Sequence, residues 1–157
     1  HGISARTQLF STVPHALGFE DPKKFFTAIA RDRVHPDESL APVVFDLANA
    51  GDSAAIEVVS HVAKQHARDI QGIVLQLSFP AGAIPVIRAG GLHTANCTVF
   101  NNAFESELRS LVPQAAMSVL DIAPVYGSVV HAANRYFGKT PEGFISQLHL
   151  AAQKVEI

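Results

Sequence analysis

The spacing of apolar residues along the chain predicts mostly helices. Two segments show the three- and four-residue steps that place apolar side chains on one face of a helix. The first runs from Leu40 to Ala48 and is followed by Gly51, a typical helix stop. The second begins after Asp52, which can cap it. Its apolar residues form a seam for packing against another helix: Ile56, Val59, Ala63, His66, Ile70, Ile73 and Leu77.

Three shorter helices are predicted from caps and apolar stripes. One opens at Asp21-Pro22, a cap followed by a first-turn proline. Another runs from Pro124 to Phe137 and is closed by Gly138, and a third follows Thr140-Pro141 at the end of the chain. The apolar stripe of the helix that opens at Asp21-Pro22 consists of Phe25, Phe26 and Ile29. That of the helix after Thr140-Pro141 consists of Phe144, Leu148, Ala152 and Val155.

Two short segments predict strands. Residues 84–89 are rich in β-branched side chains and end in Gly90-Gly91, and residues 116–120 form the second segment. A helix with Phe100 and Phe104 on one stripe lies between them. Strand, helix and strand with short connections imply a parallel β-α-β unit in a helix-rich α/β fold. Because parallel sheets are normally wider than two strands, we expect the remaining strands of the sheet to lie elsewhere.

Composition narrows the classes of function. Apolar residues make up 48% of the 157 residues and charged residues 17%, which excludes intrinsic disorder. A net charge of −2 gives no basic footprint for nucleic acid, and no apolar run is long enough to span a membrane. A single cysteine, Cys97, predicts a reducing cytoplasm and an inert thiol. The first residue is His1, which suggests a tag remnant, a processed terminus or a fragment.

The strongest candidate for chemistry is the loop of residues 88–93. Two glycines at the carboxyl end of a strand let the backbone turn sharply and approach a flat or charged ligand, and ligands of open α/β sheets bind at that edge. A plain tight turn explains the same glycines, and both readings stay open. For Gly51-Asp52, a helix stop followed by a cap is a complete explanation. No spacing typical of a hydrolase elbow, a P-loop, a Rossmann turn or a side-chain metal site occurs.

Three segments resemble a known family in their order and spacing. Residues 43–55 resemble its "A…GD..A" helix junction, residues 86–92 its adenosine motif, and residues 124–128 its "PxxGA" turn. The resemblance is to the C-terminal lobe of the actin-like sugar kinase superfamily, in the branch of the N-acetylglucosamine kinases and BadF/BadG/BcrA/BcrD-type ATPases. It covers about residues 5–138. Ser128 stands where the family usually has alanine, and Arg88 where many members have a small residue.

The resemblance implies a fold and a division of the chain. The expected fold is a partial ribonuclease H-like (actin-like ATPase) lobe over residues 1–138, followed by an amphipathic helix over residues 139–157. The family's glycine-rich phosphate hairpins and catalytic aspartate motif have no counterpart in this sequence. Since phosphoryl transfer depends on positioning and on electrostatic stabilisation of the phosphates, we expect the isolated chain to be inactive.

The resemblance also implies ligands and partners. ATP and Mg²⁺ are the expected cofactors of the parent protein, and no residue of this chain is a candidate for catalysis or for metal binding. Adenine nucleotide is the expected ligand, and a homodimer or a missing N-terminal half the expected partner. Two other functions stay open: a helical dimerisation or interaction module that uses the seam from Ile56 to Leu77, and a sugar-phosphate sensing domain. The predicted nucleotide-binding residues are Gly90, Gly91 and Leu92, with Asn96 and Gly127 beside them.

Overall fold

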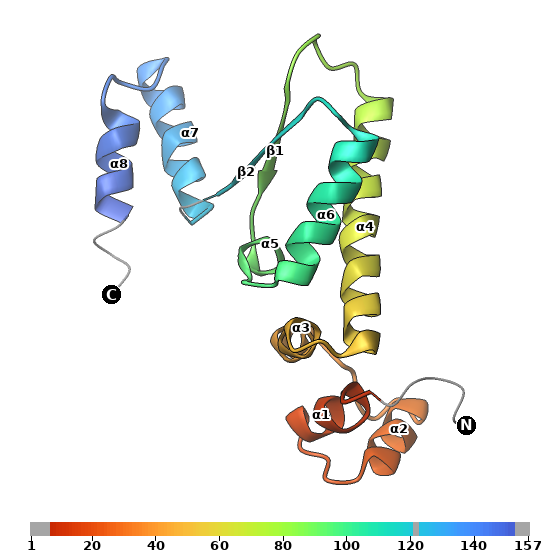
Figure 1. The fold of residues 1–157 in the computed structure, drawn as a ribbon. Helices are drawn as coiled ribbons and strands as arrows, with labels where there is room; N and C mark the ends of the chain where they lie inside the picture. Colours follow the sequence, from red (N-terminus) through yellow and green to blue (C-terminus); the bar gives the residue numbers. More distant parts are fainter. Residues whose placement is uncertain (1–6, 121–122, 153–157) are drawn as a thin grey trace. The chain divides into compact units, whose positions relative to one another are not determined.

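The computed structural model of the chain describes residues 7–120 and 123–152 (Figure 1). Its elements form two compact units, His1–Pro85 with Ala95–Ala116 and Val86–Thr94 with Met117–Ile157. The helices are α1 (Leu9–Ala16), α2 (Pro22–Ala30), the 3₁₀ turn η1 (Glu38–Leu40), α3 (Ala41–Asn49), α4 (Ser53–Gln76), α5 (Gly91–Thr94), α6 (Thr98–Leu111), α7 (Val125–Phe137) and α8 (Phe144–Ala152). The strands are β1 (Ile84–Arg88) and β2 (Ala115–Val119).

The two strands pair in parallel, as predicted. The Ile84 N–H donates to the Gln114 carbonyl at 2.9 Å, and the Leu120 N–H donates to the Arg88 carbonyl at 2.8 Å. Each predicted strand lies within one residue of its observed bounds. The helix-rich α/β class is therefore confirmed. The sheet has two strands among the described residues, and Ile87 on β1 is 63% exposed.

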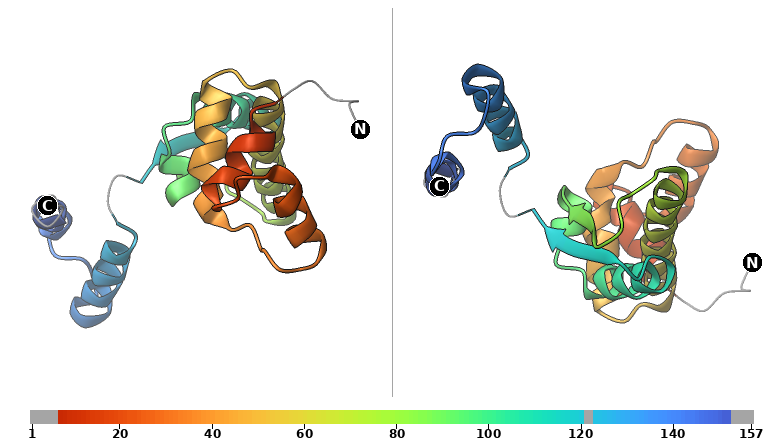
Figure 2. Two further views of the ribbon diagram at one scale, coloured as in Figure 1. Left: turned by 90° about the horizontal axis from the view of Figure 1, so that it is seen from below. Right: turned by 90° about the horizontal axis from the view of Figure 1, so that it is seen from above.

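The core of the first unit lies between α4 and α6, which run side by side (Figures 1 and 2). One face of α4 carries small side chains at four-residue steps, and one face of α6 carries large ones. Small side chains let the helix axes approach closely, and the large side chains fill the space that remains. The buried residues on the two faces are Ala55, Val59, Ala63 and Ala67 of α4 and Phe100, Phe104 and Leu108 of α6.

The predicted seam of α4 is covered only in part. Val59 and Ala63 are buried, and the half-buried His66 meets the ring of Phe100 edge-on at 6.0 Å. Ile73 and Leu77, at the other end of the seam, are exposed. The reason is length: α4 has 24 residues and α6 has 14, so at 1.5 Å per residue α6 covers about 21 Å of a helix about 36 Å long.

Apolar side chains of the second unit are mostly exposed. Ala133 is its one buried apolar residue among those described, whereas Tyr136 is 83% exposed. The predicted terminal helix is present as α8, and Val155 of its predicted stripe lies outside the described residues. A division of the chain at residue 138 stays a prediction. No helix in the described ranges combines the length and the apolar character needed to cross a membrane.

Candidate functional site

The predicted binding turn begins directly after β1. Gly90 has φ +82°, a left-handed conformation that is strained for residues with a side chain. Its carbonyl accepts a hydrogen bond from the His93 N–H at 3.1 Å, which closes the turn into α5. Gly90, and not its neighbour Gly91, is therefore the residue for which the backbone of this turn requires glycine.

Gly91 has a different role in the same turn. Its φ lies outside the left-handed region, and a Cβ added there would meet no atom within 4 Å. Gly91 is exposed and the adjacent Leu92 is half-buried. The turn thus offers bare backbone at Gly91 beside an apolar side chain, a combination that suits a flat ring.

Asn96 belongs to the first unit, where its backbone is held by Asn49 at the end of α3. The Asn49 amide nitrogen donates to the Asn96 carbonyl at 3.0 Å. The Asn49 side-chain oxygen accepts from the Thr98 N–H at 3.2 Å, which caps the start of α6. One side chain thus fixes both the segment that carries Asn96 and the helix that follows it, while the Asn96 side chain remains exposed.

Asp52 organises the neighbouring junction between α3 and α4. Gly51 has φ +93°, and the Asp52 carboxylate accepts from the Ala55 N–H at 3.0 Å, so the predicted stop and cap are confirmed. The same carboxylate accepts from the Thr7 hydroxyl at 2.7 Å and from the Gln8 N–H at 2.7 Å. These hydrogen bonds, to the Ala55 N–H first and then to Thr7 and Gln8, hold the pKa of Asp52 below its ordinary value. Asp52 therefore joins the starts of α1 and α4.

Gly127 lies in the first turn of α7, in the second unit. Its N–H donates to the Pro124 carbonyl at 3.0 Å, and it is exposed. Its φ is outside the left-handed region and a Cβ would meet nothing within 4 Å. The backbone therefore does not require glycine here, although glycine weakens a helix by about 1 kcal/mol relative to alanine.

The five predicted residues fall into three local settings. Gly90, Gly91 and Leu92 share one turn, Asn96 lies in the first unit, and Gly127 lies in the first turn of α7 in the second. Cys97, predicted to be inert, is buried. Within residues 7–120 and 123–152, no group of three or more histidine, cysteine, aspartate or glutamate side chains could hold a metal ion.

The sequence pattern gave no indication that Asn49 holds the segment of residues 96–98 in place. Asn49 sits at the end of a helix, where a polar residue is unremarkable, and its partners lie 47 and 49 residues further along the chain. Only the packing of α3 beside the start of α6 brings them together. Comparison with protein-family models, with curated proteins and with solved structures finds no match to this chain.

Proposed function

We propose that this chain is the nucleotide-binding portion of an ATP-dependent sugar kinase or a BadF-type ATPase, with a ribonuclease H-like fold. The turn at Gly90 carries the proposal. It places a left-handed glycine, an exposed glycine and a half-buried leucine at the carboxyl end of a strand in a parallel sheet. That edge is where open α/β sheets bind their ligands.

The turn would hold the adenosine end of the nucleotide through its backbone. Gly91 presents no side chain to keep a flat ring away, and Leu92 supplies an apolar surface for the ring to cover. Few contacts of this kind give weak binding. Millimolar affinity corresponds to only about 4 kcal/mol, and we expect little more from this chain.

Mg²⁺ and the phosphates are expected to depend on residues outside this sequence. The described residues offer no cluster of carboxylates that fits a magnesium ion, so no step of phosphoryl transfer is assigned to them. This chain's part is to bind and orient the base and the ribose. We therefore expect no ATP hydrolysis and no sugar phosphorylation by the chain alone.

Calorimetric titration of the chain with adenosine and with the variant Gly91→Val tests the proposal. A branched side chain at Gly91 would occupy the space of the ring, so adenosine binding should be lost while the fold is retained. Gly72→Val is the matched control, since Gly72 also lacks a left-handed φ and has no atom within 4 Å of its Cβ position. Equal adenosine binding by Gly91→Val and the parent chain would contradict the proposal.

A second candidate is a helical module that self-associates. The observation that favours it is the uncovered end of the predicted seam, where Ile73 is 53% exposed and Leu77, four residues further on, is 57% exposed. Exposed apolar clusters of this kind are typical of interfaces. Sedimentation of the chain and of Ile73→Glu separates the candidates: a dimer that this variant dissociates supports the module, and a monomer at high concentration rejects it.

A further inference from the structure

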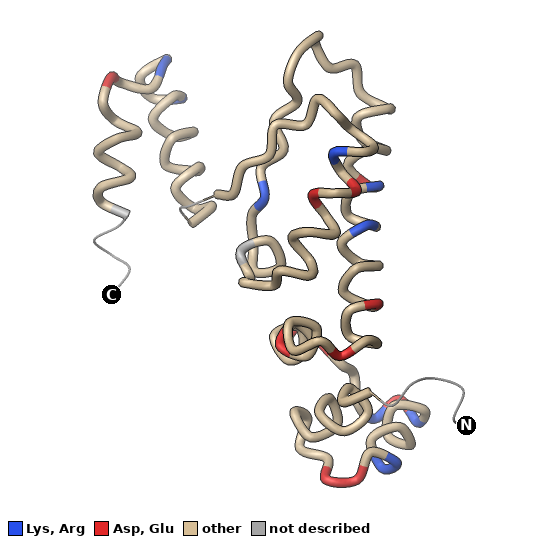
Figure 3. Tube along the Cα trace, in the orientation of Figure 1, with Lys and Arg blue, Asp and Glu red and all other residues tan. Residues whose placement is uncertain are grey.

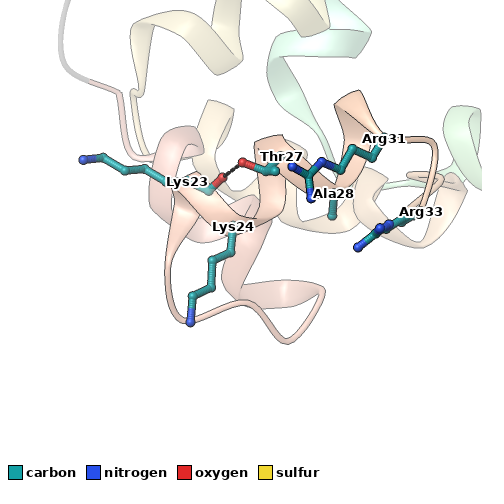
Figure 4. Close-up of a pocket in the computed structure, with 6 residues that line it drawn as sticks. All are labelled: Lys23, Lys24, Thr27, Ala28, Arg31 and Arg33. Atoms are coloured by element: carbon teal, nitrogen blue, oxygen red, sulfur yellow. Dashed lines mark hydrogen bonds between the residues drawn. The ribbon is translucent and has the colours of Figure 1, made fainter.

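A cationic hollow lies on α2, in the first unit and apart in sequence from the adenosine turn. Its volume is about 250 Å³ and it is lined by Lys23, Lys24, Thr27, Ala28, Arg31 and Arg33 (Figure 4). Four of the chain's 12 lysines and arginines therefore line one hollow, in a protein whose net charge is −2. Figure 3 shows blue segments along the part of the chain around α2, near the N-terminal end.

The four cations of this hollow differ from the arginines of α4 and α6. Arg68 pairs with Glu107 at 3.0 Å, and Arg109 lies 4.0 Å from Glu105. In the described part of the chain, no ion pair engages a cation of the hollow. The nearest carboxylate in sequence, Asp32, does not line the hollow; it is 91% exposed and lies 3.6 Å from His35. Among the described residues, the four cations of the hollow thus form no ion pair.

The backbone at the end of α2 brings the two arginines to the same hollow. The Arg33 N–H donates to the Ala28 carbonyl at 2.9 Å, which folds the chain back over the last turn of the helix. Asp32 adopts φ +56° to allow this, the one left-handed residue other than glycine among those described. The corresponding residues after α1 and α3 are Gly18 and Gly51. Aspartate enters the left-handed region more readily than most residues with a side chain, which allows this reversal without glycine.

We propose that this hollow binds a small anion that carries phosphate groups. Arginine guanidinium groups bind phosphate through paired N–H donors, and the volume is below the range of about 300–1,000 Å³ usual for organic ligands. In Figure 4 the guanidinium groups of Arg31 and Arg33 lie on either side of Ala28, whereas the lysine ammonium groups extend away. Arg31 and Arg33 are therefore the main ligands. The Thr27 hydroxyl donates to the Lys23 carbonyl at 2.7 Å and supplies no donor.

The test is a titration of the whole chain with inorganic pyrophosphate, in which NMR monitors the signals of the backbone amides. Pyrophosphate should shift the amides of residues 28–33. Arg31→Gln with Arg33→Gln should weaken binding about tenfold or more, because charge-assisted hydrogen bonds are lost. The matched control is Arg68→Gln with Arg109→Gln, which gives the same net charge and should leave the affinity within about threefold. If the glutamine pair does not fold, Arg31→Lys with Arg33→Lys keeps the charge and should bind with intermediate affinity.

Three results would overturn the proposal. The first is an equal loss of pyrophosphate affinity in both glutamine pairs, and the second is no shift of the amides of residues 28–33. The third is that a single-stranded oligonucleotide displaces pyrophosphate from those amides at a concentration lower than that of pyrophosphate. The last would identify a nucleic-acid backbone as the ligand. Pyrophosphate carries no base and adenosine carries no phosphate. Failure of this proposal and failure of the adenosine proposal are therefore independent results.

Discussion

The turn after β1 depends on two adjacent glycines that should respond differently to the same substitution. Gly90 has φ +82° and Gly91 does not have a left-handed φ, while a Cβ would meet no atom within 4 Å at either position. Replacing each by alanine therefore isolates the backbone effect, because no steric clash is introduced. Gly90→Ala should destabilise the turn and Gly91→Ala should not.

The size of the effect follows from the backbone conformation. An L-residue in the left-handed region costs about 1–2 kcal/mol, and a methyl group added at Gly90 would meet no atom within 4 Å that could offset that cost. Gly91 opens the short helix α5, where alanine is favoured over glycine by up to about 1 kcal/mol. The two variants should thus differ in local stability by at least about 1 kcal/mol, and in opposite directions.

Amide hydrogen exchange measures this locally. The His93 N–H is bonded to the Gly90 carbonyl, and the Leu120 N–H is bonded to the Arg88 carbonyl at the end of β1. In Gly90→Ala both amides should exchange about 5- to 30-fold faster, the factor that corresponds to 1–2 kcal/mol. In Gly91→Ala they should exchange no faster than in the parent chain. Equal acceleration in both variants would refute the assignment of the left-handed conformation to Gly90.

Three further predictions concern stability. The pKa of Asp52 is depressed in the folded chain, so its contribution to folding stability is present above the unfolded value of about 3.9 and is lost as the pH falls through the lower folded value. Asp52→Asn should therefore be less stable than the parent at pH 7, and the difference should be smaller below about pH 4. Urea melts at both pH values measure this difference. Phe104→Ala should cost about 3–5 kcal/mol in urea unfolding because the ring is fully buried, against about 1 kcal/mol for Phe26→Ala, whose ring is 46% exposed; similar losses would contradict the position of the core. Asp32→Gly should stabilise the chain by about 1 kcal/mol, by removing left-handed strain and a negative charge at a helix C-terminus, and a lower melting temperature would count against that reasoning.

Helices with strong local signals were predictable from the sequence. The Asp52 cap, the Gly51 stop and the helix α4 itself rest on local features, and the structure confirms them, although α6 covers only part of the predicted seam. The parallel pairing of β1 with β2 was also predictable, because a helix of suitable length lies between two short apolar segments. In these elements the local pattern and the tertiary packing favour the same structure.

The helix α1 shows why other elements were missed. It has eight residues, contains Pro14, and its first residues receive no side-chain cap from Gln8. Its start is instead held by Asp52, more than 40 residues away in sequence. The clamp of Asn49 on residues 96–98 has the same origin. Such long-range hydrogen bonds leave no periodic trace in the sequence, so only the folded chain reveals them.

The cationic hollow of α2 was likewise invisible in the composition. A net charge of −2 gives no sign of a basic surface, because acidic residues elsewhere balance the four cations in the total. The reversal of the chain at Asp32, which brings Arg33 back toward Ala28, has aspartate at the position that glycine occupies after α1 and α3, so no glycine in the sequence marks it. The positions of the charged residues in the folded chain, and not only their net charge, therefore decide whether a basic surface exists.

The central claim is that the turn at Gly90 binds the adenosine end of a nucleotide. An NMR titration of the chain with adenosine tests it most directly, because adenosine lacks the phosphates that the cationic hollow would attract. The account predicts millimolar binding, worth about 4 kcal/mol, with shifts at the amides of Gly90, Gly91 and Leu92. Saturating adenosine that leaves these three amides unchanged would contradict it.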